Sequence, residues 1–345
     1  MILSMDKIGD VPPWQSLPLA LMAVARRFGT VIDFDDLNAA LGLSTLTCAV
    51  STELDCRNWC LYARDAFLPE AAKLFGMDVR EIHPPESAVG LAGFKEFDQH
   101  FDASYRPLVS NALSHGQAVI AWRGWPKGRE LCWGIIQKEC HEGIGFEGAV
   151  YQAPDSPNPE RIEEFLGALE EPPVQIYVIE RVLPVQPTVE QTRDTAIEHA
   201  LHILRNDCGS SFGAITGPLA FDEWIGFVRA GTANEAESTA PLDSSRSLAG
   251  ALLHAHRSAV RFWTRQDSTR VPSRVSPWEA VTESLRDIVS ALERVVSAPV
   301  PQLGRMRSHL DTIVTGLADA RAASLRIKAA LSSRTEEAVG KRNVP

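Results

Sequence analysis

The chain has 345 residues, 45% of them hydrophobic and 23% charged, a balance typical of a soluble globular protein with enough apolar material for two cores. No stretch has the length and apolarity of a membrane span, and the first ten residues lack the basic start and apolar run of a secretory signal. We therefore expect a cytoplasmic protein that does not contact a membrane.

Cysteine usage bears on the redox state of the protein, and charge distribution bears on its domain organisation. The six cysteines lack the density of a disulfide framework, which favours reduced thiols. Residues 1–184 hold 15 basic and 26 acidic residues, a net charge of −11, whereas residues 185–345 hold 19 and 18, a net charge of +1. This asymmetry predicts two domains and argues against nucleic acid as a partner of the first.

The first strong helical signal lies between residues 11 and 29. Pro12 keeps the preceding backbone extended, Ser16 stands where a helix N-cap is expected, and Pro18 falls in the first turn, where a missing N–H costs nothing. Apolar residues recur at helical spacing and also fill most of the remaining surface, until Gly29 ends the pattern. We expect a helix that is buried on nearly all sides.

The next part of the chain alternates helical and strand patterns. Helices are expected between Asp33 and Gly42 and at about 66–75, 94–102 and 106–115, and strands at 77–82, 118–122, 132–136, 145–151 and 174–182. Short connections between the strands from 118 to 151 predict an antiparallel sheet there. Residues 1–184 are therefore predicted to form an α+β domain.

Beyond the connector containing Pro184 and Pro187 the pattern becomes entirely helical. The expected helices lie at 188–205, 214–230, 242–265, 277–297 and 302–333. Residues 185–345 are predicted to form an all-helical second domain.

A hydroxyl side chain at the start of a buried helix is a candidate reaction centre. Helix N-termini concentrate partial positive charge and unpaired N–H groups, which lower the pKa of a thiol and supply donors for an oxyanion. Ser16 occupies that position, so its surroundings decide whether it has a chemical role.

Three segments carry a resemblance to a known superfamily. Trp-Gln-Ser-Leu-Pro-Leu-Ala-Leu-Met-Ala-Val-Ala-Arg-Arg-Phe-Gly at 14–29 resembles the nucleophile helix of bacteriocin-processing cysteine peptidases, and more closely that of the papain-like family that includes the butirosin-biosynthesis acyltransferase. Gln-Ala-Val-Ile-Ala-Trp-Arg-Gly-Trp followed by Cys-Trp-Gly-Ile-Ile resembles that family's second signature, and Tyr-Gln-Ala-Pro-Asp at 151–155 the third. The resemblance implies a papain-like domain, with its N-terminal central helix packed on an antiparallel sheet, followed by a helical C-terminal region.

Carried over position by position, the resemblance places the nucleophile at Ser16, the base at Cys132 and the orienting carboxylate at Asp155. The family's cysteine and histidine are both replaced, and Leu17 stands where a glycine usually follows the nucleophile. A serine hydroxyl needs an adjacent base, and a thiol does not take and return a proton near pH 7 as imidazole does. The resemblance therefore implies a catalytically degenerate protein.

Each of these positions also has a structural interpretation. Ser16 is explained by capping its helix, Cys132 by packing as a small core residue, and Asp155 by a turn. A displaced base from His115 or His141 stays open, because spatial neighbours are not visible in spacing.

A ligand-contacting set is predicted around the same helix start. Trp14 and Gln15 directly precede Ser16, and the hairpin contributes three tryptophans and a cation. If exposed, the hairpin residues form an aromatic and basic lip; if buried, the tryptophans are core. The hairpin set comprises Trp122, Arg123, Trp125 and Trp133.

The sequence predicts neither a metal nor a cofactor. Cys56 and Cys60 lack the further ligands of a zinc site, and His254 and His256 are two apart, so they point in different directions on a helix. No His-Glu-x-x-His pattern occurs.

We expect a non-catalytic papain-like protein that binds a small molecule, a peptide or an acyl-carrier-linked ligand. One alternative is an active acyltransferase or amide hydrolase that uses Ser16. Another is an interaction module that forms a homodimer through its helical domain.

Overall fold

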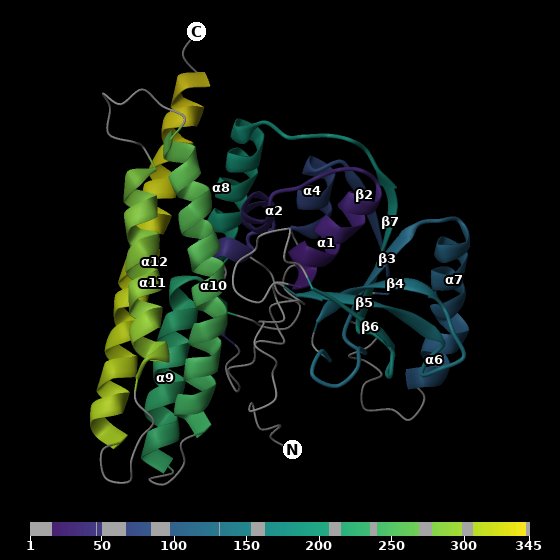
Figure 1. Ribbon diagram of the computed structural model, residues 1–345. Helices are drawn as coiled ribbons and strands as arrows, with labels where there is room; N and C mark the ends of the chain where they lie inside the picture. Colours follow the sequence, from purple (N-terminus) through teal and green to yellow (C-terminus); the bar gives the residue numbers. More distant parts are fainter. Residues whose placement is uncertain are drawn as a thin grey trace. The chain divides into compact units, whose positions relative to one another are not determined.

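The computed structural model describes residues 16–45, 47–49, 67–83, 97–130, 132–152, 163–206, 215–234, 240–268, 278–298 and 306–342 (Figure 1). The chain divides into two compact units, Met1–Leu37 with Trp59–Thr188, and Asn38–Asn58 with Val189–Pro345. Residues 38–58 thus belong to the second unit, whereas the sequence placed all of 1–184 in the first. Charge and hydrophobic periodicity indicated a domain boundary near residue 184. They gave no sign that residues 38–58 belong to the second unit.

A six-stranded antiparallel sheet forms the centre of the first unit, so the fold is mixed α+β. Its strand order is β2-β7-β3-β4-β5-β6, and every neighbouring pair is antiparallel. The strands are β2 (Met77–His83), β3 (Ala118–Trp122), β4 (Trp133–Glu139), β5 (Phe146–Gln152), β6 (Glu163–Ala168) and β7 (Gln175–Val182). The antiparallel prediction is confirmed, and β6 was missed.

Helices cover both faces of this sheet. Figure 1 shows α1 (Ser16–Arg27) and α4 (Leu68–Leu74) on one side, and α6 (Phe97–Ser104) and α7 (Arg106–Ser114) on the other. We call these sides the α1 face and the α7 face. Successive side chains of a strand point to opposite faces, so each strand contributes to both layers.

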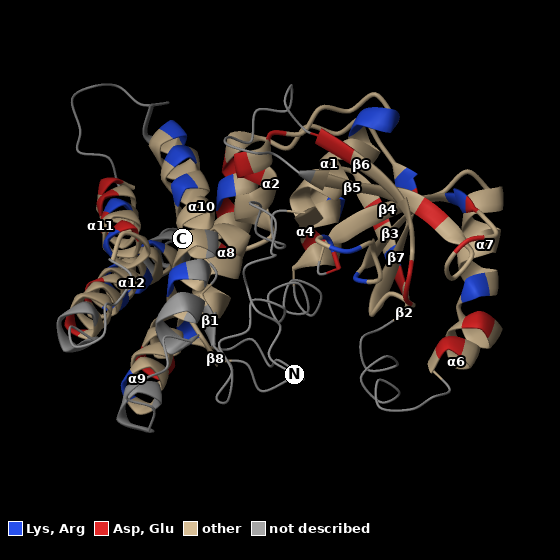
Figure 2. Cartoon of the chain, turned by 60° about the horizontal axis from the view of Figure 1, so that its bottom comes forward, with Lys and Arg blue, Asp and Glu red and all other residues tan. Residues whose placement is uncertain are grey.

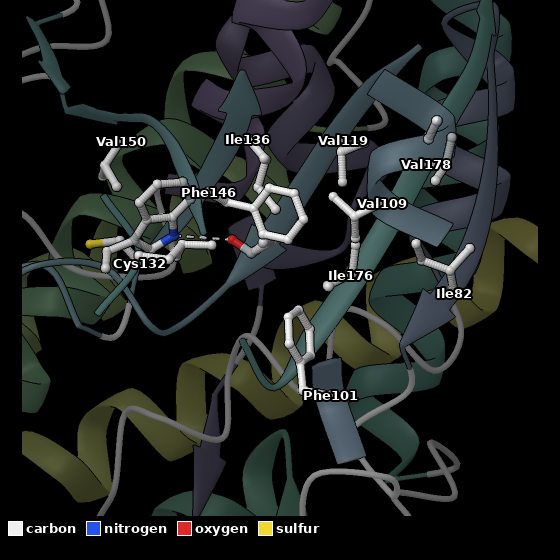
Figure 3. Packing of buried hydrophobic residues seen from close by; sticks show 14 residues of the cluster. Ile82, Phe101, Val109, Val119, Cys132, Ile136, Phe146, Val150, Ile176 and Val178 are labelled. Atoms are coloured by element: carbon white, nitrogen blue, oxygen red, sulfur yellow. Dashed lines mark hydrogen bonds between the residues drawn. The ribbon is translucent and has the colours of Figure 1, made fainter. Parts of the chain in front are cut away.

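The α7 face is a continuous apolar core (Figure 3). Phe101 of α6 and Val109 of α7 pack against strand residues that alternate along the chain, such as Val119 and Ala121 of β3. Residues between these positions, such as Ile120, are buried without belonging to this cluster. The strands therefore read as nearly continuous apolar runs because both of their faces are covered.

The predicted central helix is confirmed as α1. Nine of its twelve residues are buried, and it packs on β4 and β5. Its C-terminal end is closed at Gly29, whose φ of 78° suits a residue without Cβ, and Thr30 N–H donates to Ala25 O at 3.0 Å. Local sequence signals therefore fixed both the position and the burial of this helix.

The second unit is helical apart from short elements. Its long helices are α8 (Val189–Arg205), α9 (Pro218–Asn234), α10 (Ala240–Ser268), α11 (Glu279–Val296) and α12 (Met306–Arg342), and Figure 2 shows basic residues along α10 and residues of both charges along α11 and α12. Helix α11 packs against both α10 and α12. Among the described residues, no helix is long and apolar enough to cross a membrane.

The segment beginning at residue 38 enters this second unit through paired polar groups. Asn38, near the end of α2 (Phe34–Ala40), donates from Nδ2 to Ser258 Oγ at 3.0 Å, and His199 hydrogen-bonds Ala40 O. Farther on, β1 (Cys48–Ala49) pairs with β8 (Ile215–Thr216). The prediction of an all-helical second domain therefore missed this small sheet, to which the N-terminal half contributes a strand.

Candidate functional site

The start of α1 is hydrogen-bonded to the start of β4. Ser16 is the first residue of the helix and only 1% exposed, and its Oγ accepts a hydrogen bond from the backbone N–H of Trp133 at 2.7 Å. Capping of its own helix by this hydroxyl stays a prediction. The hydrogen bond from Trp133 joins two elements that lie 117 residues apart in the sequence.

Cys132, the position matched to the family's base, lies in the apolar cluster of the α7 face. Figure 3 shows it near Val150, and Trp125 belongs to the same cluster. The next residue, Trp133, points to the α1 face, where its ring lies 5.9 Å from that of Tyr177. The alternation of side chains thus presents Trp133, rather than Cys132, to the side on which α1 lies.

The predicted exposed aromatic lip does not form. Trp122, Trp125 and Trp133 are each at most 1% exposed. Trp122 and Trp133 are cross-strand partners in β3 and β4, and Trp125 packs in the α7-face core. Burial of indole area outweighs exposure here because the sheet is covered on both faces.

Arg123, the cation of the predicted ligand-contacting set, lies in a turn. Arg123 has a φ of 69°, which turns the chain immediately after β3, and its guanidinium carbon lies 5.7 Å from the Trp122 ring centroid. The remaining predicted site residues, Trp14, Gln15 and Asp155, lie outside the described residues.

The two histidines considered as displaced bases lie at the wrong end of the strands. His141 follows the end of β4 opposite to Trp133, and a strand of this length separates the two ends by about 20 Å. His115 caps the end of α7, just before β3 begins, which is likewise the end far from Trp122 and its partner Trp133.

The other two histidines of the first unit lie on the α7 face. His83 pairs with Ile176 at the edge of the sheet, three strands away from β4, and its ring stacks near the rings of Phe101 and Tyr105. Burial lowers its pKa to about 4. His100 contacts Tyr105 on the same side. All four histidines of the first unit are described, and none lies at the start of α1.

One buried polar side chain on the α1 face, that of Gln175, was not predicted, whereas Trp133 belonged to the predicted ligand-contacting set. Gln175, the first residue of β7, lies opposite Trp122 in the sheet and is fully buried. Neither its Oε1 nor its Nε2 hydrogen-bonds any residue that the structure describes, and the same holds for the Trp133 indole N–H. The only sequence signal was a glutamine at the start of an otherwise apolar strand.

A charged network stands at the other end of α1. Arg27 donates to the Tyr151 hydroxyl at 3.3 Å, and that hydroxyl donates to Glu164 Oε1 at 2.8 Å. Burial, together with the hydrogen bond to Glu164, raises the pKa of Tyr151 above its ordinary value. The phenol is therefore a hydrogen-bond donor to a carboxylate here and not a base.

Known proteins and metal chemistry add no constraint on this site. The sequence matches no protein-family model and no curated protein. Within the described parts of the chain, no three His, Cys, Asp or Glu side chains gather as a metal site would require.

Proposed function

We propose that this chain is a catalytically degenerate papain-like protein that binds a ligand at the start of α1 without transforming it. The observation that carries the proposal is the 2.7 Å hydrogen bond from Trp133 N–H to Ser16 Oγ, together with the positions of the four histidines of the first unit. A serine nucleophile needs a base within hydrogen-bonding reach. Here the hydroxyl serves as an acceptor for the backbone of β4.

The placement of α1 supports the papain-like part of the proposal. An early buried helix packs on a later antiparallel sheet, and its first residue meets the start of β4. That is the relation between the nucleophile helix and the base-bearing strand that the resemblance implies. The family's cysteine and histidine are replaced by Ser16 and Cys132 in this chain, and Asp155 lies outside the described residues.

The alternative of an active acyltransferase or amide hydrolase loses support from the same contacts. Its base would have to come from a histidine, and His115 and His141 lie at the opposite end of β3 and β4. Cys132 packs in the apolar core of the α7 face, away from the side on which α1 lies.

Treatment of the full chain with a fluorophosphonate probe tests the proposal. We expect no covalent labelling of Ser16, and the same absence in the Ser16→Ala variant, when intact masses are compared over several hours. A known serine hydrolase labelled in parallel shows that the probe is active. Labelling of the wild-type chain that disappears in Ser16→Ala would overturn the proposal and restore the active-enzyme alternative.

A further inference from the structure

Gln175 is a buried amide that needs a partner. It is fully buried at the start of β7, and none of its polar atoms is hydrogen-bonded to a described residue. Buried side-chain amides in native proteins are nearly always paired, because an unpaired polar group loses its hydration without compensation. Such an atom set indicates a bound polar group.

The Trp133 indole N–H lies on the same face and at the same end of the sheet. The ring centroids of Trp133 on β4 and Tyr177 on β7 are 5.9 Å apart, with β3 between the two strands. Tyr177 stands two residues after Gln175, so both point to the α1 face. The backbone N–H of Trp133 donates to Ser16 Oγ, which places the start of α1 at the start of β4.

A comparison with other buried tryptophans shows that the free indole is unusual. Trp125 donates its indole N–H to Ala121 O at 3.3 Å, and Trp224 donates to Ser245 Oγ at 2.9 Å. Trp133 makes no such bond with any described residue. Buried indole N–H groups usually find an acceptor, so this donor also calls for one.

The donors and acceptor together define the complementary group. Gln175 offers an acceptor oxygen and an N–H₂ donor, and Trp133 offers one further donor. A primary amide matches this set, because its oxygen accepts from Trp133 and from Gln175 Nε2 while its own N–H donates to Gln175 Oε1. A carboxylate has no hydrogen for that oxygen, and an alcohol lacks the planar pair of donor and acceptor.

We propose that Gln175 and Trp133 bind the primary amide group of a small ligand on the α1 face of the sheet. This inference rests on the proposed non-catalytic function and names the ligand chemistry of the same site. The pairing of two amides through reciprocal N–H···O bonds supplies the specificity.

The test is a titration of the ¹⁵N-labelled full chain with propionamide, observed through the tryptophan indole N–H resonances. The Trp133 resonance is assigned by its loss in Trp133→Phe. We expect it to shift in a saturable manner while the Trp125 resonance stays in place. Propionate and 1-propanol at the same concentrations should leave the Trp133 resonance unchanged.

Two substitutions make the test specific. Gln175→Leu should abolish the response to propionamide, and Gln175→Met is the second variant if the leucine protein does not fold. Gln137→Leu is the matched control, because Gln137 is a partly exposed glutamine whose Nε2 donates to Glu164, and its loss should leave the response intact.

The outcomes separate this inference from the proposed function. No shift of Trp133, an equal shift with propionate or propanol, or a response that survives Gln175→Leu would each overturn the amide assignment. Such a result without fluorophosphonate labelling leaves the non-catalytic function standing. Labelling of Ser16 overturns that function whatever the titration shows.

Discussion

The two faces of the central sheet differ in how they treat polar atoms, although the same strands supply both. On the α7 face the core is apolar, and the indole of Trp125 is paired with Ala121 O. On the α1 face, Ser16, Trp133 and Gln175 bring polar groups into a buried layer. His83 is a buried polar side chain on the α7 face as well, so the two faces differ in the kind of polar group that they bury. One buries an imidazole among aromatic rings, and the other buries hydroxyl, indole and amide groups.

The comparison also shows where ionisation is suppressed. His83 on the α7 face is held neutral by its burial among aromatic rings, whereas the α1 face keeps neutral amide, hydroxyl and indole groups. Among the described residues, no histidine of the first unit lies at the start of α1 beside Ser16. The three predictions that follow test this contrast, beginning with the largest expected effect.

His83→Phe should flatten the pH dependence of unfolding. The pKa of His83 is about 4 in the folded chain against 6.5 for the ordinary side chain, so the unfolded state binds more protons between those values. Stability should therefore fall as pH is lowered through this window, by about 2 kcal/mol between pH 7 and pH 5 from His83 alone. Urea unfolding at both pH values measures the difference between wild type and variant.

A buried histidine of the second unit does not affect the difference in pH dependence between wild type and His83→Phe. His256 has its pKa lowered to about 4 as well, again by burial, but it is present in both proteins and its contribution cancels. His115→Phe, at an exposed helix end, is the matched control and should retain the wild-type slope. An unchanged slope in His83→Phe would mean that His83 is not buried in neutral form.

Ser16→Ala should destabilise the first unit by about 1–3 kcal/mol, because the buried N–H of Trp133 loses the Ser16 oxygen as its acceptor. The exposed Ser114, which hydrogen-bonds the backbone of its own helix, is the control; Ser114→Ala should change stability by about 0.5 kcal/mol or less. Urea denaturation followed by tryptophan fluorescence reports both values. Equal effects at the two serines would show that the contact between α1 and β4 contributes nothing.

The smallest expected effect compares two buried tryptophans. Trp125→Phe and Trp133→Phe remove similar apolar area, but only the first breaks an indole hydrogen bond to a described residue. We expect Trp125→Phe to be the more destabilising by about 1 kcal/mol. Chemical denaturation of the two single variants gives the comparison, and the reverse order would indicate that the Trp133 indole is already paired within the chain.

Several elements of the fold were readable from local sequence. Helix α1 was predicted from its proline-marked start, apolar content and closing Gly29, and β3 from an apolar run at 118–122. Strand β6 was missed because Glu163 and Glu164 begin an edge strand whose side chains are largely exposed. An edge strand of this kind carries little of the hydrophobic pattern that marks the inner strands.

The candidate site was only half predicted. The sequence paired Ser16 with the region of Cys132, and the hydrogen bond from Trp133 N–H shows the two segments to be adjacent. Which side chain faces the helix depends on a single step of the strand, because neighbouring residues point to opposite faces. The resemblance matched the family's base to Cys132, but a match in sequence does not show whether residue 132 or residue 133 points to the α1 face.

By itself, the sequence determined where the early buried helix begins and ends, which later segments are strands, and where the chain turns helical, because capping, periodicity and turn residues act over a few positions. Only the tertiary structure decided that residues 38–58 join the second unit, that the tryptophans are buried, and that Gln175 shares a face with Trp133. Those outcomes depend on the pairing of strands far apart in the chain, and strand register is set by packing across the whole sheet.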